Sequence, residues 1–190
     1  MLFRSTAIGA LLSAAIAIGV PRVVVQTIDG TPVDALAAPA GVKAMVFVFT
    51  STDCPISNRY APELQRIAAT FASKGVAFRF VYPNPVDTAS GIREHLTAYA
   101  LGAPSQVLRD PTQALVKFAH ATVTPEAAVV VGGRVVYLGR IDDRYVELGV
   151  ERSAPTRRDL AEALSAVLEG RKVAQPATQA VGCFIADFAR

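Results

Sequence analysis

Apolar residues after position 20 form short continuous runs and stripes with helical spacing, which predict strands and helices respectively. The run 43–50, KAMVFVFT, is rich in Val and Phe. It predicts a central strand buried on both faces, as in a sheet covered by helices. The runs 75–83 and 105–110 predict two further strands, the second of them short.

Two hairpins are expected, one near each end of this region. Residues 22–36 have the pattern of a strand, an Asp29-Gly30 turn and a short return strand. The runs 125–131 and 134–141 are separated only by Gly132-Gly133. A two-residue Gly-Gly connection is typical of a tight hairpin.

Four helices are predicted from apolar stripes and from residues that start or end helices. The first runs from Pro62 to about Gly75, the second covers 88–101, the third covers 111–120 with Pro111 at its first position, and the last runs from Thr156, with Asp159 as a T-x-x-D cap, to Gly170. Strands and helices alternate and then end in a hairpin and a helix. This order implies an α/β fold with a central mixed sheet and helices on both faces.

The first twenty residues differ from the rest of the chain. Arg4 is followed by an apolar run of about fifteen residues with an A-x-A-like site at 15–17. This pattern predicts a secretory signal peptide, and the run is short for a membrane-spanning helix. An uncleaved N-terminal membrane anchor and a buried N-terminal helix are the alternatives. A signal or an anchor places the protein outside the cytoplasm, in the periplasm or beyond, where a disulfide persists.

Composition fits one globular domain, predicted over 22–170, followed by a tail over 171–190. The 190 residues are 52% hydrophobic and 18% charged, with a net charge of +3. That is enough apolar material for a core without metals or many disulfides. The basic residues are scattered, so nucleic-acid binding is not expected.

Cys54 is the candidate nucleophile, because a strand ends and a helix begins around it. Free backbone N–H groups and the positive end of the helix dipole stabilise a thiolate at such a position. A thiolate is the reactive form in disulfide exchange and in attack on peroxide. Pro55 starts the turn into the helix.

Three stretches in this order, FTSTDCPISNRYAPEL, VTPEAAVV and VYLGRIDDRY, resemble the redoxin group of the thioredoxin-like superfamily. This group includes the alkyl hydroperoxide reductase and thiol-specific antioxidant relatives, and the resemblance covers about residues 22–170. It implies a three-layer thioredoxin-like fold. It also implies that Pro125 is a cis proline beside Cys54, and that Thr124 offers its backbone to an incoming thiol substrate.

The chain departs from both family patterns at the cysteine. Ser57 stands where thioredoxins have the second cysteine of C-x-x-C. Ser51 and Phe47 stand where peroxiredoxins have Thr and Pro. Ser51 can still donate a hydroxyl hydrogen bond, but the missing proline favours disulfide exchange over efficient peroxide reduction. Arg59 either supports the thiolate or is solvated at the start of the helix.

Cys183, in the tail, admits three interpretations. It is a resolving cysteine that forms a disulfide with Cys54 after Cys54 has reacted, a permanent structural partner of Cys54, or a small buried apolar residue. Two cysteines in an exported protein favour pairing.

A metal site is a weaker alternative. Cys54, His120 and Cys183 would together suit copper or zinc. His120 is otherwise a helix-end histidine, which the helix dipole favours.

The sequence thus predicts an exported thiol-dependent oxidoreductase without a cofactor. Its partners would be a thiol or disulfide protein substrate, or a peroxide, and an unidentified electron donor. A copper-binding assembly factor and a non-catalytic thioredoxin-fold interaction module are the rival functions.

Overall fold

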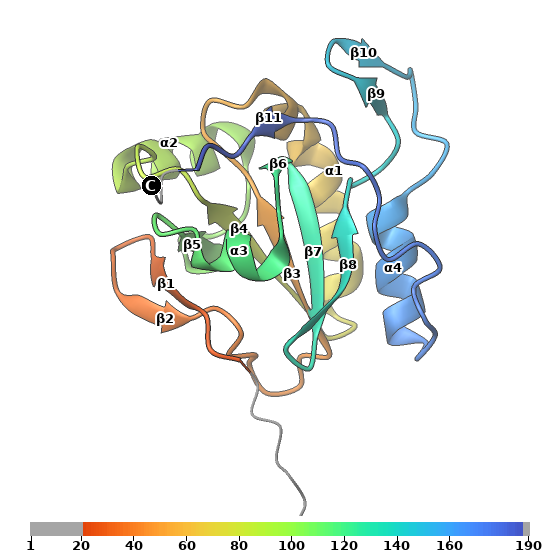
Figure 1. Ribbon diagram of the computed structural model, residues 1–190, viewed down its shortest axis with the longest axis horizontal. Coiled ribbons are helices and arrows are strands. Elements are labelled where there is room, and N and C mark those ends of the chain that lie inside the picture. The colour runs from red at the N-terminus through yellow and green to blue at the C-terminus, as the bar shows by residue number, and fades with distance from the viewer. Residues whose placement is uncertain (1–20, 188–190) are drawn as a thin grey trace, which may run out of the picture.

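The computed structural model describes residues 21–187, in which a central sheet is flanked by helices (Figure 1). The sheet has seven strands in the order β2-β1-β5-β4-β3-β7-β8. These strands are β1 (Val24–Thr27), β2 (Pro32–Asp34), β3 (Ala44–Phe49), β4 (Val76–Tyr82), β5 (Val107–Arg109), β7 (Glu126–Val131) and β8 (Arg134–Gly139). The predicted signal sequence at 1–20 lies outside the described residues. No helix within residues 21–187 is both long and apolar enough to cross a membrane.

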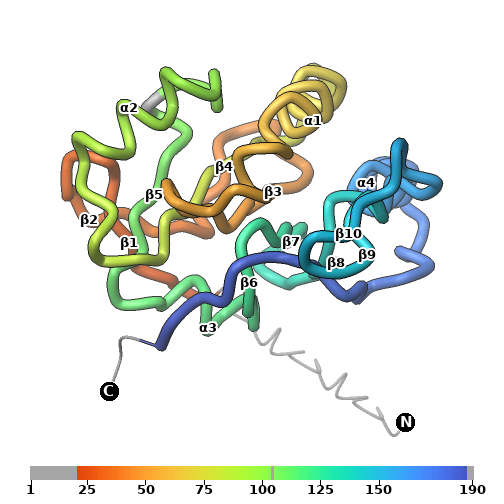
Figure 2. The backbone as a smooth tube through the Cα atoms, turned by 90° about the horizontal axis from the view of Figure 1, so that it is seen from above, coloured from red at the N-terminus to blue at the C-terminus, as the bar shows by residue number. Residues whose placement is uncertain are grey.

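The helices cover both faces of the sheet, as predicted. They are α1 (Pro55–Ala72), α2 (Ala89–Tyr99), α3 (Ala114–Ala119) and α4 (Asp159–Leu168), with a 3-10 turn, η1, at Pro104–Gln106. Figure 2 shows α1, α2 and α4 on one side of the sheet and α3 on the other. Two apolar cores result, one on each side. The fold therefore has the three layers expected from the sequence.

Strand β3 is the centre of the sheet, as its apolar run predicted. All six of its residues are buried. It pairs in parallel with β4 and antiparallel with β7. Alternate side chains enter the two cores, Val46 and Val48 on the side of α1 and Phe47 on the side of α3. The two predicted hairpins are also present, as β1–β2 and β7–β8.

Helix α1 begins at Pro55 and not at Pro62, where the apolar stripe had placed its start. Proline is well tolerated in the first turn of a helix, where an N–H has no helical partner. Pro62 lies inside the helix. Tyr60 and Ala61 are buried and extend the apolar face upstream of it, so burial outweighs the lost backbone hydrogen bond. Because α1 begins at Pro55, Cys54 is its N-cap residue.

The starts of two other helices were predicted too early, whereas that of α1 was predicted too late. Helix α3 begins at Ala114 instead of Pro111, because the buried carboxylate of Asp110 accepts hydrogen bonds from the N–H groups of residues 114–116. Helix α4 begins at Asp159, and the N–H and hydroxyl groups of Thr156 instead donate to Asp143. Asp110 thus caps α3, whereas Asp143 holds the turn before α4, whose N-cap residue Arg158 makes no side-chain cap hydrogen bond.

The chain after α3 contributes four short strands outside the main sheet: β6 (Val123–Thr124), β9 (Tyr145–Glu147), β10 (Val150–Glu151) and β11 (Cys183–Phe184). The tail first follows β8, where the N–H of Leu138 donates to Pro176 and the N–H of Thr178 donates back to Leu138. It then crosses to β6, with which β11 pairs antiparallel (Figure 1). The tail is therefore attached to the domain along its length.

Candidate functional site

Cys54 lies between the end of β3 and the first turn of α1, and only 1% of it is exposed. Its thiol donates a hydrogen bond to the carbonyl oxygen of Thr124 at 3.0 Å. The Thr124-Pro125 peptide bond is cis, as the family resemblance implied. The loop before β7 therefore presents a backbone carbonyl to the sulfur of Cys54.

The tail brings the second cysteine to the same carbonyl-bearing residue. Strand β11 pairs with β6 so that Cys183 lies opposite Thr124 and Phe184 opposite Val123. Both cysteines are free thiols. Each of the two thiols shifts the pKa of the other through a hydrogen bond, downward for Cys54 and upward for Cys183. The structure therefore places these two predicted residues together, although 129 positions separate them in the sequence.

The two sulfurs have different ionisation tendencies. Burial alone would raise the pKa of Cys54, but hydrogen bonds from Cys183, Ser57 and Thr124 favour the thiolate and bring the pKa below its ordinary value. Burial raises the pKa of Cys183 to about 12, and the hydrogen bond to Cys54 and the negative charge of Asp53 act in the same direction. Of the two thiols, Cys54 therefore ionises more readily and Cys183 less readily.

Ser57 occupies the position of the absent second C-x-x-C cysteine, in the first turn of α1. Its side chain is buried, and its hydroxyl oxygen has no hydrogen-bond partner among the described residues while Cys54 is a thiol. The same hydroxyl lowers the pKa of Cys54, because it can donate to the ionised sulfur. A thiolate at Cys54 would thus satisfy a buried polar group that the thiol leaves without a partner.

The other polar residues predicted to support Cys54 are oriented elsewhere. The hydroxyl of Ser51 donates to the carboxylate of Asp53. Arg59 is largely exposed and forms an ion pair with Glu151 of β10 at 3.0 Å. Pro55 is the first residue of α1 and positions Cys54 through the backbone.

A small cavity of about 120 Å³ adjoins Cys183. Its lining comes from the β3–α1 loop, the loop after β4, Thr124 and the tail: Ser51, Asp53, Pro83, Asn84, Thr124 and residues 183–186. It has room for a few small groups, and Cys183 lies in its wall.

The predicted alternative metal site is not assembled. His120 is exposed at the end of α3, in the left-handed conformation. Among residues 21–187, no three His, Cys, Asp or Glu side chains group closely enough to hold a metal ion.

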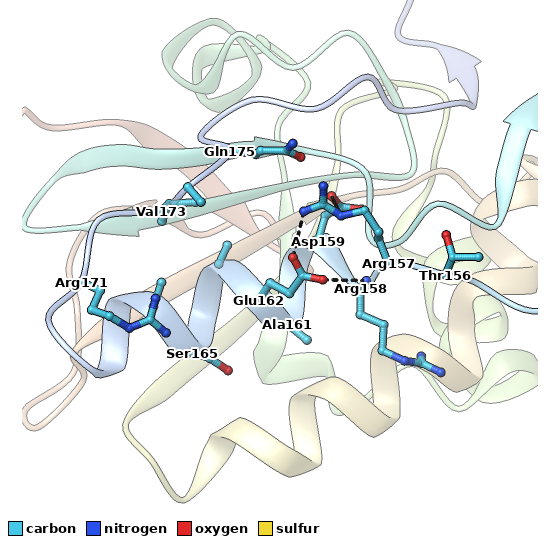
Figure 3. A pocket seen from close by; sticks show the side chains of 13 residues that line it. Thr156, Arg157, Arg158, Asp159, Ala161, Glu162, Ser165, Arg171, Val173 and Gln175 are labelled. Carbon is cyan, nitrogen blue, oxygen red and sulfur yellow. Dashed lines mark hydrogen bonds and ion pairs between the residues drawn. The ribbon is translucent and has the colours of Figure 1, made fainter.

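A larger cavity, of about 580 Å³, lies between α4 and the first part of the tail, away from the cysteines (Figure 3). Its arginines are held in ion pairs: Arg157 with Glu162 at 2.9 Å and with Asp159 at 3.7 Å, Arg158 with Glu63 at 2.9 Å and Arg171 with Glu169 at 2.6 Å. This cavity contains neither cysteine and is not part of the site around Cys54.

Sequence reasoning missed two residues that position the tail at this site. Gly182 contacts the backbone of Thr124, and Gln113 donates from its side chain to the carbonyl oxygen of Ala186 at 2.5 Å. A glycine directly before Cys183 was visible in the sequence, but its role depends on a contact with a distant loop.

Comparison with known structures identifies the fold. Two proteins described as uncharacterised are similar over nearly the whole chain at 26% identity. One, from Geobacillus kaustophilus, has a TM-score of 0.74 and covers 90% of this chain and 91% of its own. The other, from Sinorhizobium meliloti 1021, has a TM-score of 0.72 and covers 91% and 94%.

A thiol:disulfide interchange protein of the thioredoxin family from Chlorobium tepidum TLS has a TM-score of 0.55 at 18% identity, and covers 82% of this chain and 99% of its own. The fold is thioredoxin-like. No family model and no curated protein sequence matches the chain. The thioredoxin-like assignment therefore rests on structure and on the motifs around Cys54 and Thr124.

Proposed function

We propose that this thioredoxin-like protein is a thiol–disulfide oxidoreductase in which Cys54 is the nucleophile and Cys183 the resolving cysteine. The observation that carries the proposal is the position of Cys183 opposite Thr124, whose carbonyl oxygen accepts the Cys54 thiol. The unequal pKa values of the two thiols agree with these roles. Cys54, whose pKa is lowered, forms the attacking thiolate more readily, and Cys183, whose pKa is raised, stays protonated until the mixed disulfide has formed.

The reaction with a substrate disulfide has two exchange steps. The Cys54 thiolate attacks one substrate sulfur, which forms a mixed disulfide and releases the other substrate sulfur as a thiolate that takes up a proton. Cys183 then loses its proton and attacks the Cys54 sulfur. This forms the Cys54–Cys183 disulfide and releases the second substrate thiol. The substrate gains two electrons and the protein loses two, and a dithiol donor of another protein or a small thiol restores the reduced form.

Peroxide reduction through a Cys54 sulfenic acid is the second candidate reaction, with the same resolving step and water as the other product. Three features favour exchange over it. Phe47 replaces the peroxiredoxin proline, the Ser51 hydroxyl donates to Asp53 and not to Cys54, and Arg59 forms an ion pair with Glu151. Neither Ser51 nor Arg59 is therefore directed at a peroxide bound to Cys54.

Export from the cytoplasm is part of the proposal. It rests on the apolar leader in residues 1–20. The leader is then either removed or retained as a membrane anchor.

The test compares two assays on the same reduced protein. In the first, a disulfide-linked peptide is reduced with dithiothreitol as the electron donor; in the second, hydrogen peroxide is consumed with the same donor. We expect peptide turnover that is abolished by Cys54→Ser and strongly slowed by Cys183→Ser. Faster turnover of peroxide than of peptide would support the second candidate reaction. No turnover in either assay would refute an enzymatic role.

A further inference from the structure

The nucleophile of this site is closed off from solvent. Cys54 is 1% exposed, less than most residues of the apolar cores, and its thiol is engaged by Thr124 and Cys183. A substrate disulfide must reach the Cys54 sulfur in line with the bond that breaks. Some part of the structure therefore has to move before a disulfide on a polypeptide can react.

Most of the surroundings of Cys54 are fixed in the fold. Strand β3 is completely buried at the centre of the sheet, and α1 packs its buried face on the same core. Strand β7 pairs with β3 over five residue positions. These elements belong to the most stable part of the molecule, so they do not supply the opening.

The tail is attached differently. Strand β11 consists of two residues, and only two residue pairs join it to β6. Beyond them, the N–H of Ile185 donates to Thr122 at 2.9 Å, and Gln113 holds the carbonyl of Ala186. Phe184 is 85% exposed, and Ile185 packs only partly buried against the core on the side of α3. A segment held mainly by backbone hydrogen bonds opens at a low free-energy cost.

Gly182 shows how closely the tail lies on the site. A Cβ atom at this position would stand 2.2 Å from the carbonyl oxygen of Thr124 and 2.7 Å from its carbonyl carbon. Only glycine allows this approach. The tail thus covers the same Thr124 carbonyl that accepts the Cys54 thiol.

We propose that residues 182–186 form a gate over Cys54, closed on β6 in the resting dithiol protein and opened to admit the substrate. When the gate opens, residues 182–186 leave β6, so that Cys183 no longer lies opposite Thr124. When it closes, Cys183 returns to the mixed disulfide that Cys54 has formed with the substrate. The observed reactivity of Cys54 is then the product of its intrinsic reactivity and the fraction of molecules with the gate open. The gate deepens the proposed function, on which its role toward substrates rests, but its existence can be tested without turnover.

The experiment measures alkylation of Cys54 by iodoacetamide and by a bulky maleimide in a Cys183→Ser background, which leaves one thiol. In the background protein we expect slow labelling, slower for the larger reagent. Gln113→Asn shortens the side chain that holds Ala186 and tolerates the left-handed backbone at this position. It should speed labelling roughly fivefold, as the loss of one hydrogen bond would. Gly182→Val should speed it roughly tenfold or more, because its side chain collides with Thr124.

The matched control is Phe184→Ser in the same strand, which alters an exposed side chain and should leave both rates within about twofold. Low urea concentrations separate the gate from global unfolding. Opening of five residues exposes little surface, so labelling of the background protein should barely respond to urea below the unfolding transition. Labelling that rises with the slope of global unfolding, or rates unchanged in Gly182→Val and Gln113→Asn, would overturn the gate. Gated labelling without disulfide turnover would leave the gate standing and refute the proposed function.

Discussion

Cys183 lies directly opposite Thr124 in the pairing of β11 with β6, and the carbonyl of Thr124 accepts the thiol of Cys54. The C-terminal tail thereby supplies what the helix lacks, since Ser57 replaces the second cysteine of a C-x-x-C motif. The partner sulfur reaches Cys54 from another part of the chain. The proposed exchange chemistry therefore depends on how the tail is docked.

Replacing Cys183 by alanine should raise the pKa of Cys54. The hydrogen bond from Cys183 is the largest of the contributions that lower this pKa, and alanine cannot donate one. The ultraviolet absorbance of the thiolate, followed against pH, measures the change. Phe184→Ala is the control and should leave the titration in place. A Cys54 pKa that falls in Cys183→Ala would contradict the assigned electrostatics.

Ser57→Ala should raise the pKa of Cys54 without lowering the free energy of unfolding of the reduced protein below the pKa. The buried hydroxyl has no partner among the described residues in the thiol form, so its removal leaves no hydrogen bond unmade. Urea unfolding at low pH and the thiolate titration give the two quantities. A loss of stability above about 1 kcal/mol would mean that the hydroxyl already has a partner in the thiol form.

Gly139→Ala should loosen the tail upstream of Cys183. The backbone of Gly139 has φ of 155°, and a Cβ atom there would lie 2.2 Å from the hydroxyl oxygen of Thr178. We expect the Cys54–Cys183 disulfide to lose roughly tenfold in its equilibrium constant against glutathione, because the tail is less well placed. Gly91→Ala in α2, where a Cβ meets only ordinary contacts, is the control. Equal potentials in the two variants would refute a dependence on tail docking.

Glu126 supports the loop that carries β6, and its variants should show this as a change in stability. Its buried carboxylate accepts from the N–H groups of Thr122 and Val123, at 2.7 and 3.4 Å. Glu126→Ala should lower the free energy of unfolding by about 1–3 kcal/mol, since two buried donors lose their acceptor. Glu126→Gln, which keeps an acceptor oxygen, should lose less. Equal losses in the two variants would argue for packing and against the hydrogen bonds.

The same residue gives a pH dependence with a definite sign. Burial raises the pKa of Glu126 above its ordinary value of 4.5, so the folded protein binds this proton more tightly than the unfolded chain. Its contribution to stability is complete below pH 4.5 and is lost as the pH rises through the folded value. The difference in unfolding free energy between wild type and Glu126→Gln should therefore fall as pH rises through this window. A difference that grows would reverse the assignment.

The central strand β3 and the two hairpins could be predicted from the sequence, because the patterns that indicate them are local. The continuous apolar run of β3 by itself indicates a strand buried on both faces, and Gly132-Gly133 by itself indicates a tight hairpin turn. The start of α4 was misplaced because Thr156 bonds to Asp143, which lies thirteen positions earlier, where a local pattern cannot connect the two. The position of Cys54 at a helix start could be predicted, because the residues beside it carry that signal.

The environment of Cys183 could not be predicted in this way. Three interpretations of Cys183 stayed open in the sequence. The path of the tail depends on close contacts between residues far apart in the chain, Gly139 with Thr178 and Gly182 with Thr124. Arg59 shows the opposite case. Its sequence position near Cys54 suggested electrostatic support, but the hairpin β9–β10 supplies Glu151 as its partner.

The most direct test of the account is to identify the product of one reaction cycle. The reduced protein is mixed with one equivalent of a disulfide-linked peptide and quenched in acid. Free thiols are then alkylated, and the protein is digested and analysed by mass spectrometry. The account predicts a linked pair of peptides containing Cys54 and Cys183, two released peptide thiols per protein, and, in Cys183→Ser, a trapped mixed disulfide on Cys54 alone. An unmodified Cys54, or a substrate adduct on Cys183, would contradict it.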